Sequence, residues 1–352
     1  MDKTDLKLSE IGEKKLVQEI LNQLPVNKCL VDGFGHDSAF IDISVEDDEV
    51  LLVNTDRSGA NIAYGLGLAD GRCVGDFGVS HAISDILASG GQPFAVSIAL
   101  LLPPNEKVLF VKNVIQGAVE AAKKYGAFIA AGDTKHNPKF AMVVTALGKC
   151  HKSERLTRSG AQPGDLVVVT DSLGTMAAGL LAFKRNFSLD TETKELFKNA
   201  LIFQNPPYQL ARAVASERIA HAAMDNSDGL ASSLYSLSES SRVGVVLDMT
   251  TIPIHRAVLN FVKRVGADPI KLAMASGDWR FIYAVPPSKI DRFMSIAEQC
   301  NAQPSIIGRF FESSQPQVLA KWQNSIEPLQ KIENDRFGIG GTRLFQKLIT
   351  TS

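Results

Sequence analysis

The sequence predicts two domains of mixed α and β structure, a fold of the α/β or α+β class. Its 352 residues, of which 45% are hydrophobic, are enough for two globular domains with sizeable cores. Helix-like and strand-like patterns alternate along most of the chain. Residues 156–165 carry turn residues, including Pro163 and Gly164, and little apolar periodicity, so they form the best candidate linker. We therefore place the domains at residues 1–155 and 156–352.

The first domain is expected to begin with an amphipathic helix, because residues 9–24 repeat apolar side chains at helical spacing. A second helix is rich in small residues and ends where Gly90 and Gly91 precede Pro93. Three helices are therefore expected, over residues 9–24, 72–89 and about 106–125. Alternating or continuous apolar runs predict the strands of a sheet. These strands are residues 39–43, 50–53, 94–102, 127–131 and 140–147.

The second domain is expected to open with a buried strand over residues 166–170, followed by a helix of small residues from about Thr175. Strand and helix signals then alternate to residue 320, and a further helix is expected to start at about Gly229. Residues 334–341 are rich in glycine, which predicts a surface loop. No repeat of roughly 20–50 residues recurs, so a solenoid is not supported.

Composition excludes several classes of partner. A net charge of -1, without a basic stripe interleaved with aromatic residues, argues against nucleic acid. The charged start of the chain argues against secretion, and no uncharged apolar run reaches the roughly 18 residues that a membrane span needs. We expect a cytoplasmic protein with no membrane partner. Four widely spaced cysteines indicate neither a zinc site nor a disulfide framework: Cys29, Cys73, Cys150 and Cys300.

Six short acidic motifs are the strongest functional signal. Each places an aspartate at the end of an apolar stretch, beside glycine, serine or threonine, where strands usually turn. The motifs are Gly35-His36-Asp37, Asn54-Thr55-Asp56, Ile83-Ser84-Asp85, Gly132-Asp133-Thr134, Asp225-Asn226-Ser227-Asp228-Gly229 and Gly277-Asp278-Trp279. A single aspartate of this kind is more often a helix cap or a turn former than a metal ligand. Six of them together favour a magnesium and polyphosphate site, because Mg²⁺ prefers oxygen ligands and is usually held jointly by carboxylates and substrate phosphates.

Familiar nucleotide-binding motifs are absent from the sequence. There is no G-x-x-x-x-G-K-[ST] loop, no G-x-G-x-x-G after a strand and no kinase-type H-R-D segment. A metal cluster can nevertheless supply much of the catalysis of phosphoryl transfer, which requires mainly charge neutralisation and alignment. If the chain binds a nucleotide, it does so in another way.

The order of these motifs resembles that of the thiamine-monophosphate kinase family, in the superfamily of aminoimidazole ribonucleotide synthetase, selenophosphate synthetase and hydrogenase maturation factor E. The resemblance runs over roughly residues 8–286. Met224-Asp225-Asn226-Ser227-Asp228-Gly229-Leu230 is the most specific match, to M-D-I-S-D-G-L. Gly35-His36-Asp37-Ser38-Ala39 is similar to G-D-D-A-A, Asn54-Thr55-Asp56 to S-T-D, and Ala131-Gly132-Asp133-Thr134 to G-G-D-T.

The resemblance implies a two-domain PurM-like fold. Residues 1–155 would form the domain that binds ATP and Mg²⁺ and dimerises, its mixed sheet closing a barrel across a homodimer. Residues 156–352 would form an α/β sandwich like the carboxyl-terminal domain of aminoimidazole ribonucleotide synthetase. ATP and Mg²⁺ would lie between the domains, and the γ-phosphate would pass directly to a small-molecule acceptor.

The same resemblance assigns roles to single residues. The implied metal ligands are Asp37, Asp56, Asp85, Asp133 and Asp228, of which Asp133 and Asp228 are also the expected catalytic residues. The expected cofactor-binding residues are Thr55, Gly132, Thr134 and Ser227. Candidates on the acceptor side are His36, Asp278, Trp279, Arg280 and Phe337.

Departures from the family pattern gather at the acceptor end. His36 stands where the family has the first aspartate of its G-D-D turn, either as a phosphate contact or as a hydrogen-bonding residue of the turn. Phe77 and Ala82 stand where lysine and asparagine are common. Arg280 replaces an acidic residue, which favours an anionic acceptor if it faces the pocket and otherwise a surface ion pair. Trp279 could stack on a flat substrate or pack in the core.

Three functions therefore stay open at this level. The leading hypothesis is an ATP-dependent small-molecule kinase with a diverged acceptor site. The second is a synthetase of the aminoimidazole ribonucleotide type, which would release free phosphate along with ADP. The third is a non-catalytic nucleotide-binding dimer, suggested by the loss of an aspartate at His36.

Overall fold

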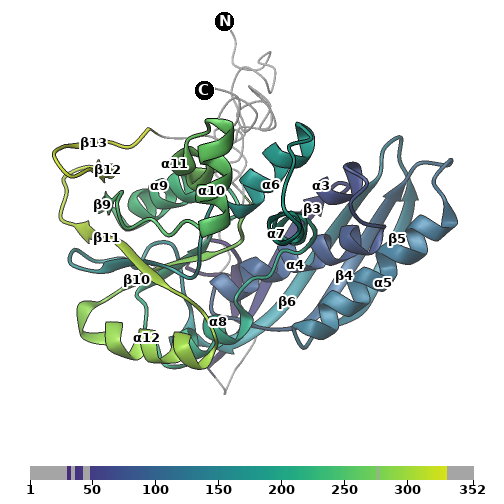
Figure 1. Cartoon of the computed structure of the whole chain (residues 1–352). Coiled ribbons are helices and arrows are strands. Elements are labelled where there is room, and N and C mark those ends of the chain that lie inside the picture. Colours follow the sequence, from purple (N-terminus) through teal and green to yellow (C-terminus); the bar gives the residue numbers. More distant parts are fainter. Residues whose placement is uncertain (1–29, 33–35, 43–47, 276, 331–352) are drawn as a thin grey trace, which may run out of the picture.

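A computed structural model describes residues 30–32, 36–42, 48–275 and 277–330 as two sheets with helices packed on them (Figure 1). The helix expected over residues 9–24, the loop over residues 334–341 and Phe337 lie outside these residues. No helix in the described ranges is both long and apolar enough to cross a membrane. The mixed α and β class predicted from the sequence is confirmed.

The amino-terminal sheet has six strands in the order β1-β2-β3-β6-β4-β5. Its strands are β1 Leu30–Val31, β2 Ala39–Asp42, β3 Glu49–Ser58, β4 Gln92–Leu102, β5 Phe128–His136 and β6 Ala141–His151. All neighbours pair antiparallel except β4 and β5, which are parallel because a helix connects them. Over the described residues the sheet is open, with β1 and β5 as its two edge strands.

Two long helices, α4 (Arg72–Ala88) and α5 (Val108–Lys124), follow β3 and β4, and the short α3 (Ile62–Gly65) precedes them. Glycines let α4 and α5 approach closely. A Cβ atom at Gly75 would lie 1.8 Å from the Val114 carbonyl oxygen, and one at Gly117 would lie 2.0 Å from the Arg72 carbonyl oxygen. The small residues that the sequence shows over residues 72–89 therefore let α4 pack closely on α5.

The carboxyl-terminal sheet has seven strands in the order β13-β12-β9-β11-β7-β10-β8. They are β7 Leu166–Val169, β8 Ala222–Asp225, β9 Gly244–Asp248, β10 Phe281–Val285, β11 Ser305–Phe311, β12 Gln317–Lys321 and β13 Ile326–Pro328. Only β9 and β12 pair in parallel. The strand expected over residues 166–170 is β7, and the helix expected from Thr175 is α6.

Helices cover both faces of this sheet (Figure 1). The helices of this domain are α6 Thr175–Lys184, α7 Thr191–Ile202, α8 Tyr208–Ser216, α9 Leu230–Ser241, α10 Arg256–Val265, α11 Pro269–Met274 and α12 Ile290–Gln299. Side chains alternate along the strands, as a sheet covered on both faces requires. In β10, Ile282 and Ala284 pack with α9, whereas Phe281, Tyr283 and Val285 face α8 and α12.

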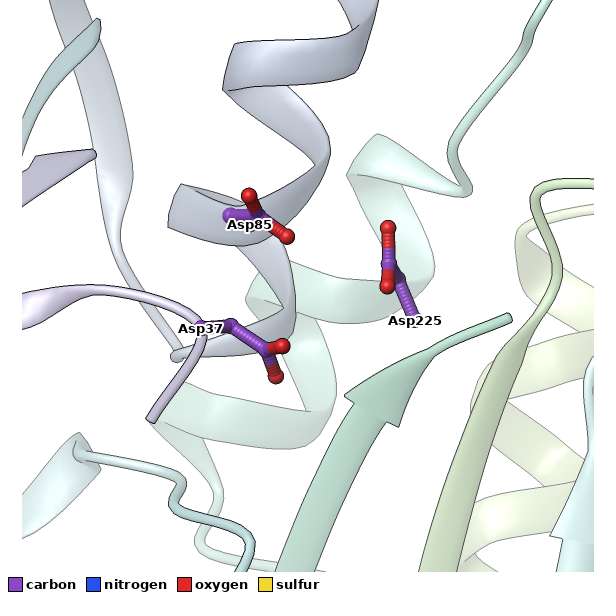
Figure 2. A group of neighbouring side chains, drawn as sticks. All are labelled: Asp37, Asp85 and Asp225. Atoms are coloured by element: carbon purple, nitrogen blue, oxygen red, sulfur yellow. The ribbon is translucent and has the colours of Figure 1, made fainter. Parts of the chain in front are cut away.

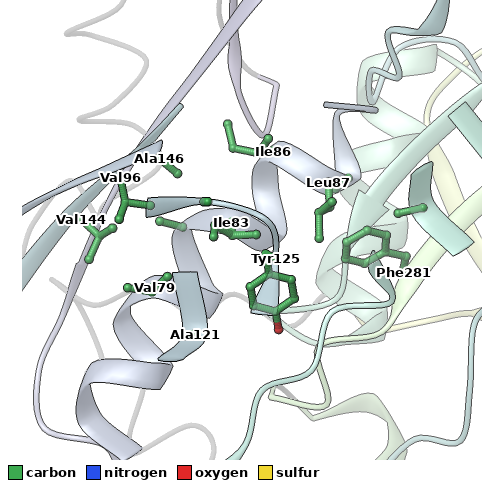
Figure 3. Packing of buried hydrophobic residues seen from close by; sticks show 14 of the residues in the cluster. Val79, Ile83, Ile86, Leu87, Val96, Ala121, Tyr125, Val144, Ala146 and Phe281 are labelled. Carbon is green, nitrogen blue, oxygen red and sulfur yellow. The ribbon is translucent and has the colours of Figure 1, made fainter. Parts of the chain in front are cut away.

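One hydrophobic core crosses from the first sheet to the second. The cluster that contains Ile83 and Leu87 of α4 also contains Tyr125 and, from β10, Phe281 (Figure 3). Helix α4 thus packs on its own sheet and also contacts β8. This shared core fixes α4 against the end of β8, which is where the acidic side chains meet.

Candidate metal and nucleotide site

Three aspartates from distant parts of the sequence converge between the two sheets. Asp37 lies just before β2, Asp85 in the last turn of α4, and Asp225 at the end of β8. Each offers a carboxylate oxygen, and the three oxygens lie within 4.8 Å of one another. Figure 2 shows the three side chains pointing toward a common space. This is a spacing at which carboxylates hold a metal ion.

Two serine hydroxyls fix the Asp225 carboxylate. Ser84 of α4 donates a hydrogen bond to Oδ2 at 2.9 Å, and Ser227 donates one to Oδ1 at 3.0 Å. The strand itself is held by β10, where Asp225 pairs with Phe281. Asp225 and Ser84 are buried, so the carboxylate has a defined orientation before any ligand arrives.

Burial and mutual repulsion perturb the carboxyl groups. Burial raises the pKa of Asp85 well above its usual range, and the charges of Asp225, Asp56 and Asp37 raise it further. Burial and then the charge of Asp37 raise the pKa of Asp225 to about 7. Like charges gathered in a buried site are costly unless a cation neutralises them, so the group is suited to a divalent metal ion.

Asp56 lies beside this group on β3. It raises the pKa of Asp85 through its charge and a side-chain hydrogen bond, which places the two carboxyl groups in contact. Asn54 donates a hydrogen bond to Asp56 Oδ2 at 2.8 Å and thereby orients it. Thr55 points elsewhere, because its Oγ1 lies 2.9 Å from Thr145 Oγ1 on β6.

Arg158 brings a positive charge into contact with the group. Its Nε donates to Asp37 Oδ1 at 3.0 Å, and its Nη2 bonds to the same oxygen. The sequence did not point to Arg158, which lies in the stretch predicted as a linker, residues 156–165, and in none of the acidic motifs. Asp225 was not among the predicted metal ligands, because Asp228 of the same motif was expected to take that role.

Further polar atoms near the group are buried without a hydrogen-bond partner. These are Asn226 Nδ2, directly after Asp225, and Ser38 Oγ, directly after Asp37. Buried polar atoms normally find a partner, so their position fits a site that binds a polar ligand. Hard carboxylate oxygens are the ligand type of Mg²⁺, and the residues present therefore fit a magnesium-bound phosphate.

The structure does not bring Asp133 into this group within one chain. Gly132, Asp133 and Thr134 lie exposed on the edge strand β5. Asp56 shares a row of the sheet with Val144, Ile98 and Gly132, so three strand spacings, about 14 Å, separate β3 from β5. Asp228 is half-buried beyond the end of β8 and is likewise not one of the three converging carboxylates.

The acceptor-side candidates have structural contacts of their own. Asp278 accepts hydrogen bonds from the backbone N–H groups of Gly174 and Met176, at 2.5 and 3.0 Å, at the start of α6. Trp279 is only 5% exposed and packs its edge on His81 at 4.5 Å between ring centroids. Arg280 lies 3.4 Å from Asp171. His36 Nε2 lies 3.1 Å from the Asp32 carbonyl oxygen, which is the contact of a turn residue.

A cavity of about 420 Å³ adjoins these residues. Its lining is mostly polar and includes Asp171, Ser172, Thr175, Asn199, Asn205, His255, Asp278, Arg280, Asn301 and Gln303. Arg280 connects it to the acidic group, because the Arg280 carbonyl accepts a hydrogen bond from the backbone N–H of Asn226 at 2.7 Å. Arg280, which lines the cavity, and Asp225 thus lie at the same end of the paired strands β10 and β8.

Comparison with known proteins defines the class. Residues 35–150 match the family model of AIR synthase related proteins, N-terminal domain, and residues 162–321 match that of the C-terminal domain. The thiamine-monophosphate kinase of Halobacterium salinarum is 33% identical over 270 residues, 74% of this chain and 83% of the relative. That of Haemophilus influenzae is 28% identical over 304 residues, 86% and 90% of the two chains.

The fold is shared with solved structures. A structure described as AaThiL complexed with AMPPCP and TMP superposes with a TM-score of 0.76 at 24% identity, covering 92% of this chain and 99% of that one. Fold, acidic group and sequence matches together define an AIR synthase related protein with a PurM-like fold. The chain belongs to the thiamine-monophosphate kinase family and is an ATP-dependent phosphotransferase of that type.

Proposed function

We propose that the chain transfers the γ-phosphate of ATP directly to an anionic small molecule, with Mg²⁺ held by Asp37, Asp85 and Asp225 and supported by Asp56. The observation that carries the proposal is the convergence of three carboxylate oxygens within 4.8 Å from three separate segments. Family membership supplies the nucleotide and the type of reaction. Direct transfer needs no dedicated protein nucleophile.

The chain's own residues would provide a fixed and largely dry site. Bound Mg²⁺ would neutralise charge on the phosphate oxygens. Ser84 and Ser227 hold Asp225, and Asn54 holds Asp56, so the carboxylates need little rearrangement. Such preorganised electrostatics is the main contribution that a protein makes to phosphoryl transfer.

A homodimer would complete the site. On β5, all residues except Ile129 are exposed, and Phe128 is 61% exposed. An exposed, unpaired edge strand normally requires a partner or a cover. We propose that a second copy pairs here to form the barrel across the dimer. Burial at that interface would bring Gly132, Asp133 and Thr134 into a nucleotide site, and Asp228 would take part from the second domain.

The acceptor is proposed to bind in the 420 Å³ cavity beside the acidic group. Arg280 offers a guanidinium there, of which Nη2 pairs with Asp171 and Nε donates to the Ser172 carbonyl. A guanidinium binds phosphate or carboxylate through paired hydrogen bonds, so the acceptor carries such a group. Thiamine monophosphate is the first candidate, because relatives of the chain are named for that reaction.

The Arg280→Met variant tests the acceptor end. Loss of the guanidinium should raise the KM for the acceptor by roughly 10- to 150-fold, since one charge-assisted contact contributes roughly 1.5–3 kcal/mol. The KM for ATP should stay within about twofold of wild type. Equal effects on both KM values would instead place Arg280 at the nucleotide or in the general structure.

The reaction is tested by incubating the protein with ATP, Mg²⁺ and candidate acceptors, and following ³¹P NMR. The proposal predicts ADP formation that depends on the acceptor, with a new phosphate resonance on the acceptor and no stoichiometric free phosphate. Release of free phosphate with a ring-closed product would support a synthetase instead. Binding of ATP without turnover across the acceptor set would contradict transfer.

A further inference from the structure

Arg158 joins the linker between the domains to the acidic group. Both of its bonding nitrogens meet one oxygen of Asp37, Oδ1, which leaves the other oxygen outside this pair. The Asp37 side chain is 3% exposed and that of Arg158 is 25% exposed. The pair is therefore largely desolvated, and removing either charge would leave the other poorly compensated.

The backbone that carries Arg158 is held in place by the second domain. The Arg158 carbonyl accepts a hydrogen bond from Ser241 Oγ at 2.8 Å, and the neighbouring Thr157 carbonyl accepts one from the backbone N–H of Ala223 at 3.2 Å. Gly160 packs so closely that a Cβ atom would lie 1.9 Å from the His221 carbonyl oxygen. The linker thus runs against the start of β8, the same strand that ends at Asp225.

The position of Arg158 offsets part of the negative charge of the acidic group. Asp37, Asp56, Asp85 and Asp225 would carry four negative charges if all were ionised, and Arg158 carries one positive charge. Burial acts to lower the pKa of Arg158, but the charges of Asp37, Asp85 and Asp225 outweigh it and raise the pKa above its usual value, Asp37 most strongly among them. The guanidinium stays charged throughout the accessible pH range.

We propose that Arg158 acts as a counter-cation for the acidic group. In the metal-free protein it partly neutralises the carboxylates, and a divalent cation takes over part of this neutralisation when it binds. The inference rests on the proposed function, because it takes the acidic group to be a Mg²⁺ site. It assigns Arg158 no contact with the reacting atoms. Without Arg158, the stability of the folded chain should therefore depend more strongly on Mg²⁺ than in wild type.

Thermal unfolding of the nucleotide-free protein, with EDTA and with saturating Mg²⁺, tests this role. In Arg158→Met, the Tm should fall in EDTA, and Mg²⁺ should restore most of the loss, so that the rise in Tm on adding Mg²⁺ is at least about twice that of wild type. The Mg²⁺ concentration at half-saturation should also fall, because the competing charge is gone. Arg158→Lys, which keeps the charge, should lie close to wild type in both measurements.

Arg155→Met is the matched control. Arg155 lies in the same stretch of chain and pairs with Asp32 at 2.8 Å, away from the three converging carboxylates. Its loss should lower the Tm equally in EDTA and Mg²⁺. If Arg158→Met does not fold in EDTA, the refolded yield as a function of Mg²⁺ concentration provides the same comparison and should rise with Mg²⁺.

The outcomes separate this inference from the proposed function. If wild type shows neither Mg²⁺ binding by calorimetry nor a change in Tm, the metal site itself is wrong. If wild type binds Mg²⁺ but Arg158→Met loses equal stability with and without the metal, or binds Mg²⁺ more weakly, only the counter-cation role is overturned.

Discussion

At the scale of single residues, the role of each aspartate depends on where the fold places it. Asp225 and Asp228 belong to one motif, and only the first is buried against Ser84 and Asp85. Asp76 and Asp85 lie on one helix, and burial raises the pKa of both carboxyl groups, yet only Asp85 gathers three other carboxylates around it. The gathering of several carboxylates, rather than the burial of a single one, therefore identifies the candidate metal site.

The raised pKa of Asp225, about 7, predicts a pH dependence. Between its ordinary value near 4 and 7, the folded metal-free protein holds a proton that the unfolded chain has released, so stability falls as pH rises through this window. Mg²⁺ must displace that proton, and burial also raises the pKa of Asp85, so the Mg²⁺ affinity should rise by about tenfold or more per pH unit toward pH 7. Calorimetry at several pH values measures the affinity and the proton release, and an affinity that is flat between pH 5 and 8 would contradict the assignment.

The sequence could predict that acidic motifs form one site, but it could not select the carboxylates that meet. That selection depends on α4 packing against β8 through a core shared by both domains, which no local pattern encodes. Arg158 was missed for the same reason. Its role is visible only once the linker is seen to lie along β8.

At the scale of elements, periodicity located strands and helices well, and their ends less well. The helix expected over residues 72–89 is α4, Arg72–Ala88. The strand expected over residues 127–131 continues to His136 as β5, because parallel pairing with β4 extends through polar residues that read locally as a turn. Tertiary pairing overrides local propensity there.

The close packing of α4 on α5 predicts a strong effect of small substitutions. Gly75→Ala should destabilise the protein by about 1–3 kcal/mol, because its Cβ would meet the Val114 carbonyl oxygen at 1.8 Å and this overpacking outweighs the helix propensity of alanine. Gly65→Ala is the control, since a Cβ there meets nothing within 4 Å. Chemical denaturation measures both, and equal stabilities of the two variants would show that the α4–α5 contact is looser than described.

At the scale of the whole molecule, the exposed strand β5 predicts association through the first domain. If the proposed dimer forms through β5, Phe128→Asp should be more monomeric than wild type in sedimentation velocity experiments, because a charge would be buried at the paired edge. Ile326→Asp is the control, as Ile326 is 60% exposed on β13, the edge strand of the other sheet. A monomeric wild type at micromolar concentration, or equal dissociation by both substitutions, would argue against pairing through β5.

The central claim is that Asp85 and Asp225 hold the Mg²⁺ of bound nucleotide. Its most direct test is the equilibrium binding of ATP, with and without Mg²⁺, to Asp85→Asn, Asp225→Asn and Asp76→Asn. Asp76 is a half-buried acid of the same helix outside the converging group, so Asp76→Asn should bind like wild type. The account predicts that Mg²⁺-dependent affinity falls by at least about 10–100-fold in Asp85→Asn and Asp225→Asn, the range seen when even an outer partner of a metal ligand is lost. Undiminished Mg²⁺-dependent binding in both of these variants would contradict it.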